Sequence, residues 1–151
     1  PYTTLFRSAF EIAKAQTAPC YVIGADTIVA FENRILGKPK DSADAVRMVS
    51  MLQGNTHQVY TGVTLIEVCA DGSLREKSFY EETNVHVCQM TKDEIASYVA
   101  TGEPLDKAGA YGIQGRGAVL VEKIEGCYNN VVGLPLTRLY QMMAQIGVKG
   151  F

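Results

Sequence analysis

Two long segments of β-strand character, residues 57–69 and 78–88, flank the pair Asp71-Gly72 and constrain the fold most strongly. Asp-Gly favours a tight hairpin turn because both residues tolerate positive φ. The pattern therefore predicts an antiparallel β-hairpin in the middle of the chain. The remaining elements are arranged around this hairpin.

Further strands are predicted before and after the hairpin. Residues 20–25 form a short apolar run rich in β-branched side chains, which is typical of a buried strand. Residues 28–31 continue this strand. Residues 32–34 predict a turn, after which residues 35–36 form a short arm that returns along the strand. Residues 118–124 predict the last strand.

Helical signals alternate with these strands. Residues 9–16 have the pattern of a helix end, with no convincing helix start in residues 1–8, and Asp41 or Ser42 can cap a helix that stops at Gly54. Thr91 and Glu94 form a capping box for a helix that runs to about residue 101. The last amphipathic helix starts at residue 134 or 135 and runs to residue 146, with an expected core stripe of Leu136, Leu139, Tyr140, Met143 and Ile146. The class predicted is α/β, with a mixed twisted sheet flanked by helices in one domain over residues 1–151.

Composition narrows the function classes. The net charge of −2 argues against binding a nucleic acid polymer, which needs clustered cations. No apolar run approaches the roughly 20 residues of a membrane helix, and no signal peptide is evident, so we expect a cytoplasmic protein. The four cysteines have no zinc-ligand spacing and are predicted to be reduced thiols.

Two short segments place ionisable groups beside a predicted strand. In Gly24-Ala25-Asp26-Thr27, the carboxylate at the end of an apolar run makes Asp26 a candidate metal ligand or general base. The alternative is an aspartate that caps a local turn. In Gly37-Lys38-Pro39, Pro39 holds Lys38 extended, so its ammonium can reach the same cleft and bind phosphate, although an ordinary surface lysine has the same pattern.

Residues 101–115 are the densest candidate segment, because glycines allow backbone N–H groups to approach a ligand closely. Asp106 offers a metal-binding or proton-accepting group, and Lys107 offers a phosphate clamp. Gln114 offers one amide donor for O4 and one amide acceptor for N3–H of uracil or thymine. We expect Asp26 and this segment to line opposite walls of one pocket. A glycine-rich loop without function is the alternative.

Other polar residues have structural explanations. Asn129 and Asn130 precede Val131-Val132-Gly133-Leu134-Pro135, and we interpret them as turn or capping residues rather than ligand contacts. His57 and His86 lie within strand patterns and are interpreted as ordinary strand residues. The methionines are assigned to core packing.

In order, the segments 24–29, 37–39, 60–63, 101–115 and 130–135 resemble the Maf-like proteins over about residues 9–146. The resemblance implies a fold related to inosine triphosphate pyrophosphatase, a homodimer, and hydrolysis of nucleoside triphosphates between the α and β phosphates with a divalent cation, Mg²⁺ or Mn²⁺. It implies that Asp26 is the proton acceptor, and we expect Asp26 and Asp106 to be the metal ligands. Lys38 would hold the triphosphate, and Thr27 and Gln114 would select the base.

The resemblance also sets expectations for the substrate and for the N-terminus. Gln114 in its Gly-Ile-Gln-Gly setting is similar to the subgroup that acts on dTTP and UTP. The family's N-terminal Ser- and Arg-rich segment has no counterpart before Ala9, so residues 1–8 are atypical and the domain is expected to be N-terminally incomplete. A non-catalytic nucleotide-binding regulator of septum formation or cell division is the alternative function.

Overall fold

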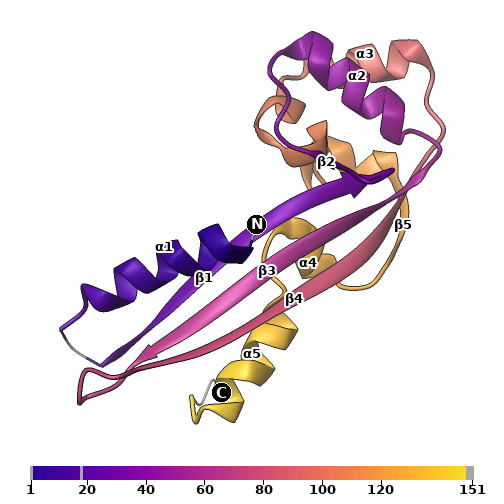
Figure 1. The fold of residues 1–151 in the computed structure, drawn as a ribbon. Coiled ribbons are helices and arrows are strands. Elements are labelled where there is room, and N and C mark those ends of the chain that lie inside the picture. The colour runs from indigo at the N-terminus through magenta and orange to yellow at the C-terminus, as the bar shows by residue number, and fades with distance from the viewer. Residues whose placement is uncertain (1, 18, 149–151) are drawn as a thin grey trace.

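The structure is a computed structural model that describes residues 2–17 and 19–148, with side chains described from Arg7 onward. Helices are interleaved with pairs of strands and single strands along the chain (Figure 1). The strands are β1 (Cys20–Phe31), β2 (Arg34–Leu36), β3 (Thr56–Val68), β4 (Leu74–Val87) and β5 (Val121–Glu125). The helices are α1 (Tyr2–Lys14), α2 (Ser42–Leu52), α3 (Lys92–Ala100), α4 (Tyr128–Val132) and α5 (Leu136–Gln145). Three short 3₁₀ segments, η1 (Glu103–Asp106), η2 (Ala108–Ala110) and η3 (Gly115–Leu120), connect α3 to β5.

The five strands form one sheet in the order β2-β1-β3-β4-β5. β3 and β4 form the predicted hairpin, with Val68 opposite Leu74 and Gly72 at φ +80° in the turn. The α/β class with flanking helices is confirmed. However, every described strand pair is antiparallel, whereas the sequence pattern predicted a mixed sheet.

The path between β1 and β3 explains this difference. β1 turns into β2 through Glu32 and Asn33, both at positive φ, which suits a tight hairpin. The chain then forms α2 at the same end of the sheet and re-enters as β3, so that Ala30 lies opposite Gln58. A parallel pair needs a helix that crosses along the sheet face, and α2 instead stays at the sheet end (Figure 1).

Each face of the β1–β3 ribbon has its own helix. On one face, Ile66 and Val68 pack with Ala9 and Ala13 of α1. On the other face, Val63 and Leu65 pack with α5. Side chains alternate between faces along a strand, so both faces of β3 are buried, and each fully buried Leu or Ile contributes roughly 1.5–3 kcal/mol. The largest buried cluster lies at the end of the sheet that α2 and α3 cover.

Local capping signals are confirmed. The Asp41 carboxylate accepts the Asp44 N–H at 2.8 Å and caps α2. Thr91 and Glu94 form the reciprocal capping box of α3, with Glu94 Oε2 accepting the Thr91 N–H at 2.7 Å. Such caps satisfy N–H groups that have no partner within the helix.

Several expected boundaries are wrong. Helix α1 begins at Tyr2, so part of the segment expected to be atypical is helical, although Pro1 lies outside the described residues. β5 begins at Val121, because the residues before it form η3. In α5, Leu136 and Tyr140 are 52% and 42% exposed, and Met142 is buried with Leu139 instead.

Two expectations about composition can be checked against the structure. All four cysteines are free thiols, as predicted. No helix within the described residues has the length and apolar character needed to cross a membrane.

Candidate functional site

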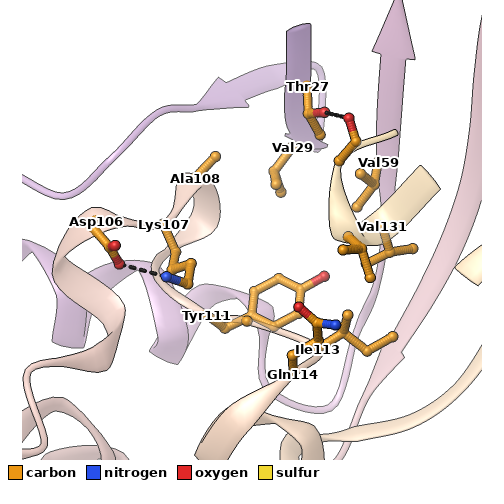
Figure 2. A pocket seen from close by; sticks show the side chains of 13 residues that line it. Thr27, Val29, Val59, Asp106, Lys107, Ala108, Tyr111, Ile113, Gln114 and Val131 are labelled. Carbon is orange, nitrogen blue, oxygen red and sulfur yellow. Dashed lines mark hydrogen bonds and ion pairs between the residues drawn. The ribbon is translucent and has the colours of Figure 1, made fainter. Parts of the chain in front are cut away.

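A cavity of about 210 Å³ opens between β1, β3, α4 and the segment that follows α3 (Figure 2). Its walls combine apolar side chains with a small number of polar ones, a composition typical of small-molecule sites. The lining residues are Thr27, Val29, Val59, Asp106, Lys107, Ala108, Tyr111, Gly112, Ile113, Gln114, Val131, Val132 and Gly133. Thr27 and residues 106–114 therefore meet at one cavity, whereas Asp26, which was expected to line the same pocket, is not among its lining residues.

β1 supplies Thr27 and Val29 to the cavity, since alternate residues of a strand share a face. The Thr27 hydroxyl lies 2.8 Å from Thr61 Oγ1 and donates to the Gly133 carbonyl at 3.3 Å. Thr61 is fully buried and donates to the Asn130 carbonyl at 3.1 Å. These contacts fix the Thr27 hydroxyl at the cavity wall.

Asp106 and Lys107 form an ion pair on the side of the cavity opposite Val59 and Val131 (Figure 2). Lys107 Nζ lies 2.7 Å from Asp106 Oδ1. The hydrogen bond from Lys107 is the main reason that the pKa of Asp106 is lowered, and the positive charge of Lys38 adds to it. Two lysine charges therefore act on this part of the cavity.

Tyr111 and Gln114 lie on a third side of the cavity (Figure 2). The Tyr111 hydroxyl is 2.8 Å from Nε2 of the fully buried His57, and the two rings meet edge to face. Burial raises the pKa of Tyr111 above its usual range, so its hydroxyl stays protonated. Within the described part of the chain, no hydrogen bond occupies the Gln114 amide, so its donor and acceptor are available to a ligand.

Asp26 and Lys38 do not line the cavity. Asp26 is exposed. Its side chain lies on the opposite face of β1 from that of Thr27, because neighbouring side chains along a strand point to opposite faces of the sheet. β2 pairs only with the end of β1, from Val29 to Phe31. In the described sheet, Asp26 and Thr27 therefore lie where β1 has no partner on the β2 side.

Lys38 is tied to the cavity through its backbone neighbours. The Gly37 carbonyl accepts the Gly109 N–H at 3.1 Å, which holds the lysine segment against residues 106–110. Gly109 has φ +73°, and a Cβ there would lie 3.0 Å from Val29 Cγ1. Only glycine gives this close approach without strain.

The two expected metal ligands, Asp26 and Asp106, differ in their relation to the cavity. Asp106 lines the cavity, and Asp26 projects to the other face of β1. Among residues 2–17 and 19–148, no group of three or more His, Cys, Asp or Glu side chains has the arrangement of a metal site. Asp106 alone fits the pattern of Mg²⁺, which often takes one or two carboxylates and completes its shell with phosphates and water.

In the segment before α5, Asn130 has the structural role that was predicted for it. Asn130 is fully buried in α4, and its side-chain N–H₂ donates to the Val59 carbonyl at 3.0 Å and to Thr83 Oγ1 at 2.9 Å. These bonds hold α4 against β3 and β4. Val131 and Gly133 carry no local signal for a cavity, because packing across the sheet places them there.

Comparison with known proteins adds independent information. The family model described as "Maf-like protein" matches residues 6–146. A protein of Agathobacter rectalis named dTTP/UTP pyrophosphatase is 58% identical over 127 residues, which cover 84% of this chain and 62% of the relative. A protein of the same name from Carboxydothermus hydrogenoformans is 51% identical over 144 residues, covering 95% of this chain and 76% of the relative. The chain thus spans about three fifths of the length of the Agathobacter relative, and by this evidence it belongs to the Maf-like family.

Proposed function

We propose that the chain binds dTTP and UTP and hydrolyses them to the monophosphate and pyrophosphate. The observation that carries the proposal is the available Gln114 amide in a largely apolar cavity, with Lys107 beside it. Family membership and the printed names of the relatives support the same chemistry.

The base would lie against the apolar walls, with its polar edge toward Gln114. Tyr111 and Val131 offer apolar surface for a planar ring. The Gln114 amide can donate to O4 and accept from N3–H of uracil or thymine. A site built to pair both groups rejects a base with a different donor and acceptor order, because its own polar groups would lose their partners.

The triphosphate would extend toward the lysines. Lys107 and Lys38 would stabilise the negative charge of the leaving pyrophosphate. Mg²⁺ or Mn²⁺ would enter with the triphosphate, with Asp106 as its protein ligand, and would neutralise charge that develops on the phosphate oxygens. Asp26 as a second ligand stays a prediction.

Asp26 would act as proton acceptor across the open edge of β1. In the proposed reaction, water oxygen bonds to the α-phosphorus, the bond to the bridging α–β oxygen breaks, and pyrophosphate leaves with that oxygen. The Asp26 carboxylate would take the proton that the water loses. The open edge beside Thr27 supports this geometry, because a ligand in the cavity can extend past it.

A nucleotide-binding regulator of cell division is the second candidate. Its support is that Asp26, the proposed proton acceptor, does not line the cavity, so that Asp106 is the carboxylate among the lining residues. We further propose, from the family resemblance, a single cytoplasmic domain that forms a homodimer. Light scattering on the purified protein measures the oligomeric state.

The deciding experiment is pyrophosphate release from dTTP, UTP, GTP and 7-methyl-GTP with Mg²⁺. The pyrophosphatase proposal expects release from the pyrimidine nucleotides, loss of release in Asp26→Asn, and an altered base preference in Gln114→Glu. Asp71→Asn in the β3–β4 turn and Gln141→Glu on the exposed side of α5 are matched controls for each change of charge. Binding of dTTP without turnover, unaffected by Asp26→Asn, would favour the regulator.

A further inference from the structure

The backbone that carries Gln114 is held by side chains rather than by a strand. The Arg116 N–H donates to Glu103 Oε2 at 2.8 Å, and the Gly117 N–H donates to Glu103 Oε1 at 2.8 Å. On the other side of Gln114, the Gly112 N–H donates to the Tyr98 hydroxyl at 3.3 Å. The segment is therefore anchored on both sides of the residue proposed to read the base.

Glu103 and Tyr98 act as one unit. The Tyr98 hydroxyl donates to Glu103 Oε1 at 3.1 Å, so the carboxylate that holds residues 116 and 117 also orients the group that holds Gly112. Desolvation acts to raise the pKa of Glu103, but the two backbone N–H bonds, the Tyr98 hydroxyl and the charge of Lys107 together outweigh it, and the pKa is lowered. Hydrogen bonds to an ionised acceptor are about twice as strong as neutral ones.

The glycines after Gln114 make room for this unit. A Cβ on Gly115, which has φ +70°, would lie 2.7 Å from Glu103 Oε2. A Cβ on Gly117 would lie 2.6 Å from the Tyr98 hydroxyl and would also meet the Gly112 carbonyl. The Gln-Gly-x-Gly pattern therefore permits the carboxylate to contact the backbone directly.

We infer that Glu103 is a positioning residue that sets base preference by holding the segment of Gln114 in the orientation needed to read the nucleobase. The inference rests on the proposed function. Glu103 does not line the cavity, so it acts through the backbone of residues 112–117 and not by touching the ligand. Its loss should weaken discrimination between bases more than it weakens binding overall.

The test compares Glu103→Gln with Glu94→Gln, which makes the same charge change in the capping box of α3, away from the cavity. A glutamine at position 103 keeps one acceptor oxygen, so one of the two backbone N–H groups loses its partner. Calorimetry measures the affinities for dTMP and GMP, which require no turnover. We expect the preference for dTMP over GMP to fall by at least about tenfold in Glu103→Gln and to stay unchanged in Glu94→Gln.

Hydrogen exchange provides the second measurement. The amides of Arg116 and Gly117 should exchange faster in Glu103→Gln, and Tyr98→Phe should lower the dTMP preference in the same direction. Because the two side chains form one unit, the double variant should lose less than the sum of the single losses. If Glu103→Gln does not fold, Tyr98→Phe alone decides the question.

The outcomes separate this inference from the proposed function. Equal weakening of dTMP and GMP binding, absence of a dTMP preference in the parent protein, or unchanged exchange at Arg116 and Gly117 would each overturn the positioning role. Lack of pyrophosphate release, together with a dTMP preference that depends on Glu103, would overturn the pyrophosphatase proposal and support the positioning role.

Discussion

Replacing His57 by glutamine should remove a large part of the fold's sensitivity to mild acid. His57 lies on β3 with no exposed surface, and its Nε2 is 2.8 Å from the Tyr111 hydroxyl. Its Nδ1 is buried without a partner among the described residues. Burial, with a smaller contribution from the charge of His86, lowers the pKa of His57 from 6.5 to about 4.

The sign and the magnitude follow from this difference in pKa. The unfolded chain binds the proton first as the pH falls, so the stabilisation is complete above the unfolded pKa of 6.5 and is lost toward the folded pKa of about 4. Through this linkage, the free energy of unfolding is lower by about 2 kcal/mol at about pH 5 and by about 3 kcal/mol at about pH 4. This is a large part of the roughly 5–15 kcal/mol that stabilises a typical domain.

Urea unfolding at several pH values between about pH 7 and pH 5 measures the effect. The parent protein should lose about 2 kcal/mol more than His57→Gln over this interval. His86→Gln is the matched control, since His86 is partly exposed beside Glu125. This variant should keep most of the parent protein's loss of stability between the two pH values. Equal losses in the parent protein and in His57→Gln would refute the assignment of a buried neutral imidazole.

Two further substitutions test the packing around the cavity. Gly109→Ala should destabilise the fold by about 2–3 kcal/mol, because its Cβ meets the buried Val29, whereas Gly72→Ala, also at positive φ but in open space, should cost about 1 kcal/mol. Similar losses of unfolding free energy in the two variants, measured by urea unfolding, would show that the contact with Val29 does not matter. Asn130→Ala should cost about 2–3 kcal/mol, since it removes two buried hydrogen bonds, including the one to Thr83. A change in midpoint corresponding to less than about 1 kcal/mol would contradict that role.

Elements that depend on neighbouring residues could be predicted from the sequence. The Thr91–Glu94 capping box, the Asp41 cap and the Asp71-Gly72 turn each lie within a few residues, and each is found where expected. Their physical basis is local hydrogen bonding and φ preference, which a short segment contains in full.

Features that depend on packing could not be predicted in the same way. The buried residues of α5 are Leu139 and Met142, with Met143 and Ile146 packed against the same cluster, whereas Leu136 and Tyr140 of the expected stripe are exposed. The contact between His57 and Tyr111 joins residues 54 positions apart, and neither residue carries a local signal for it.

The candidate site shows the same division. Thr27, Asp106, Lys107 and Gln114 line one cavity, as the glycine-rich segment and the strand end led us to expect. Asp26 does not, and strand alternation alone places it on the other face from Thr27. The sequence therefore contained the means to separate these two neighbours, whereas the open edge of β1 became evident only in the structure.

The most direct test of the central claim is an NMR titration of the protein with dTMP. If the cavity between β1 and residues 106–114 is the nucleotide site, the largest amide shifts should fall at Thr27, Lys107 and Gln114, and GMP at the same concentration should cause smaller shifts. Amide shifts confined to another surface, or no amide shifts at any dTMP concentration in the titration, would contradict the account.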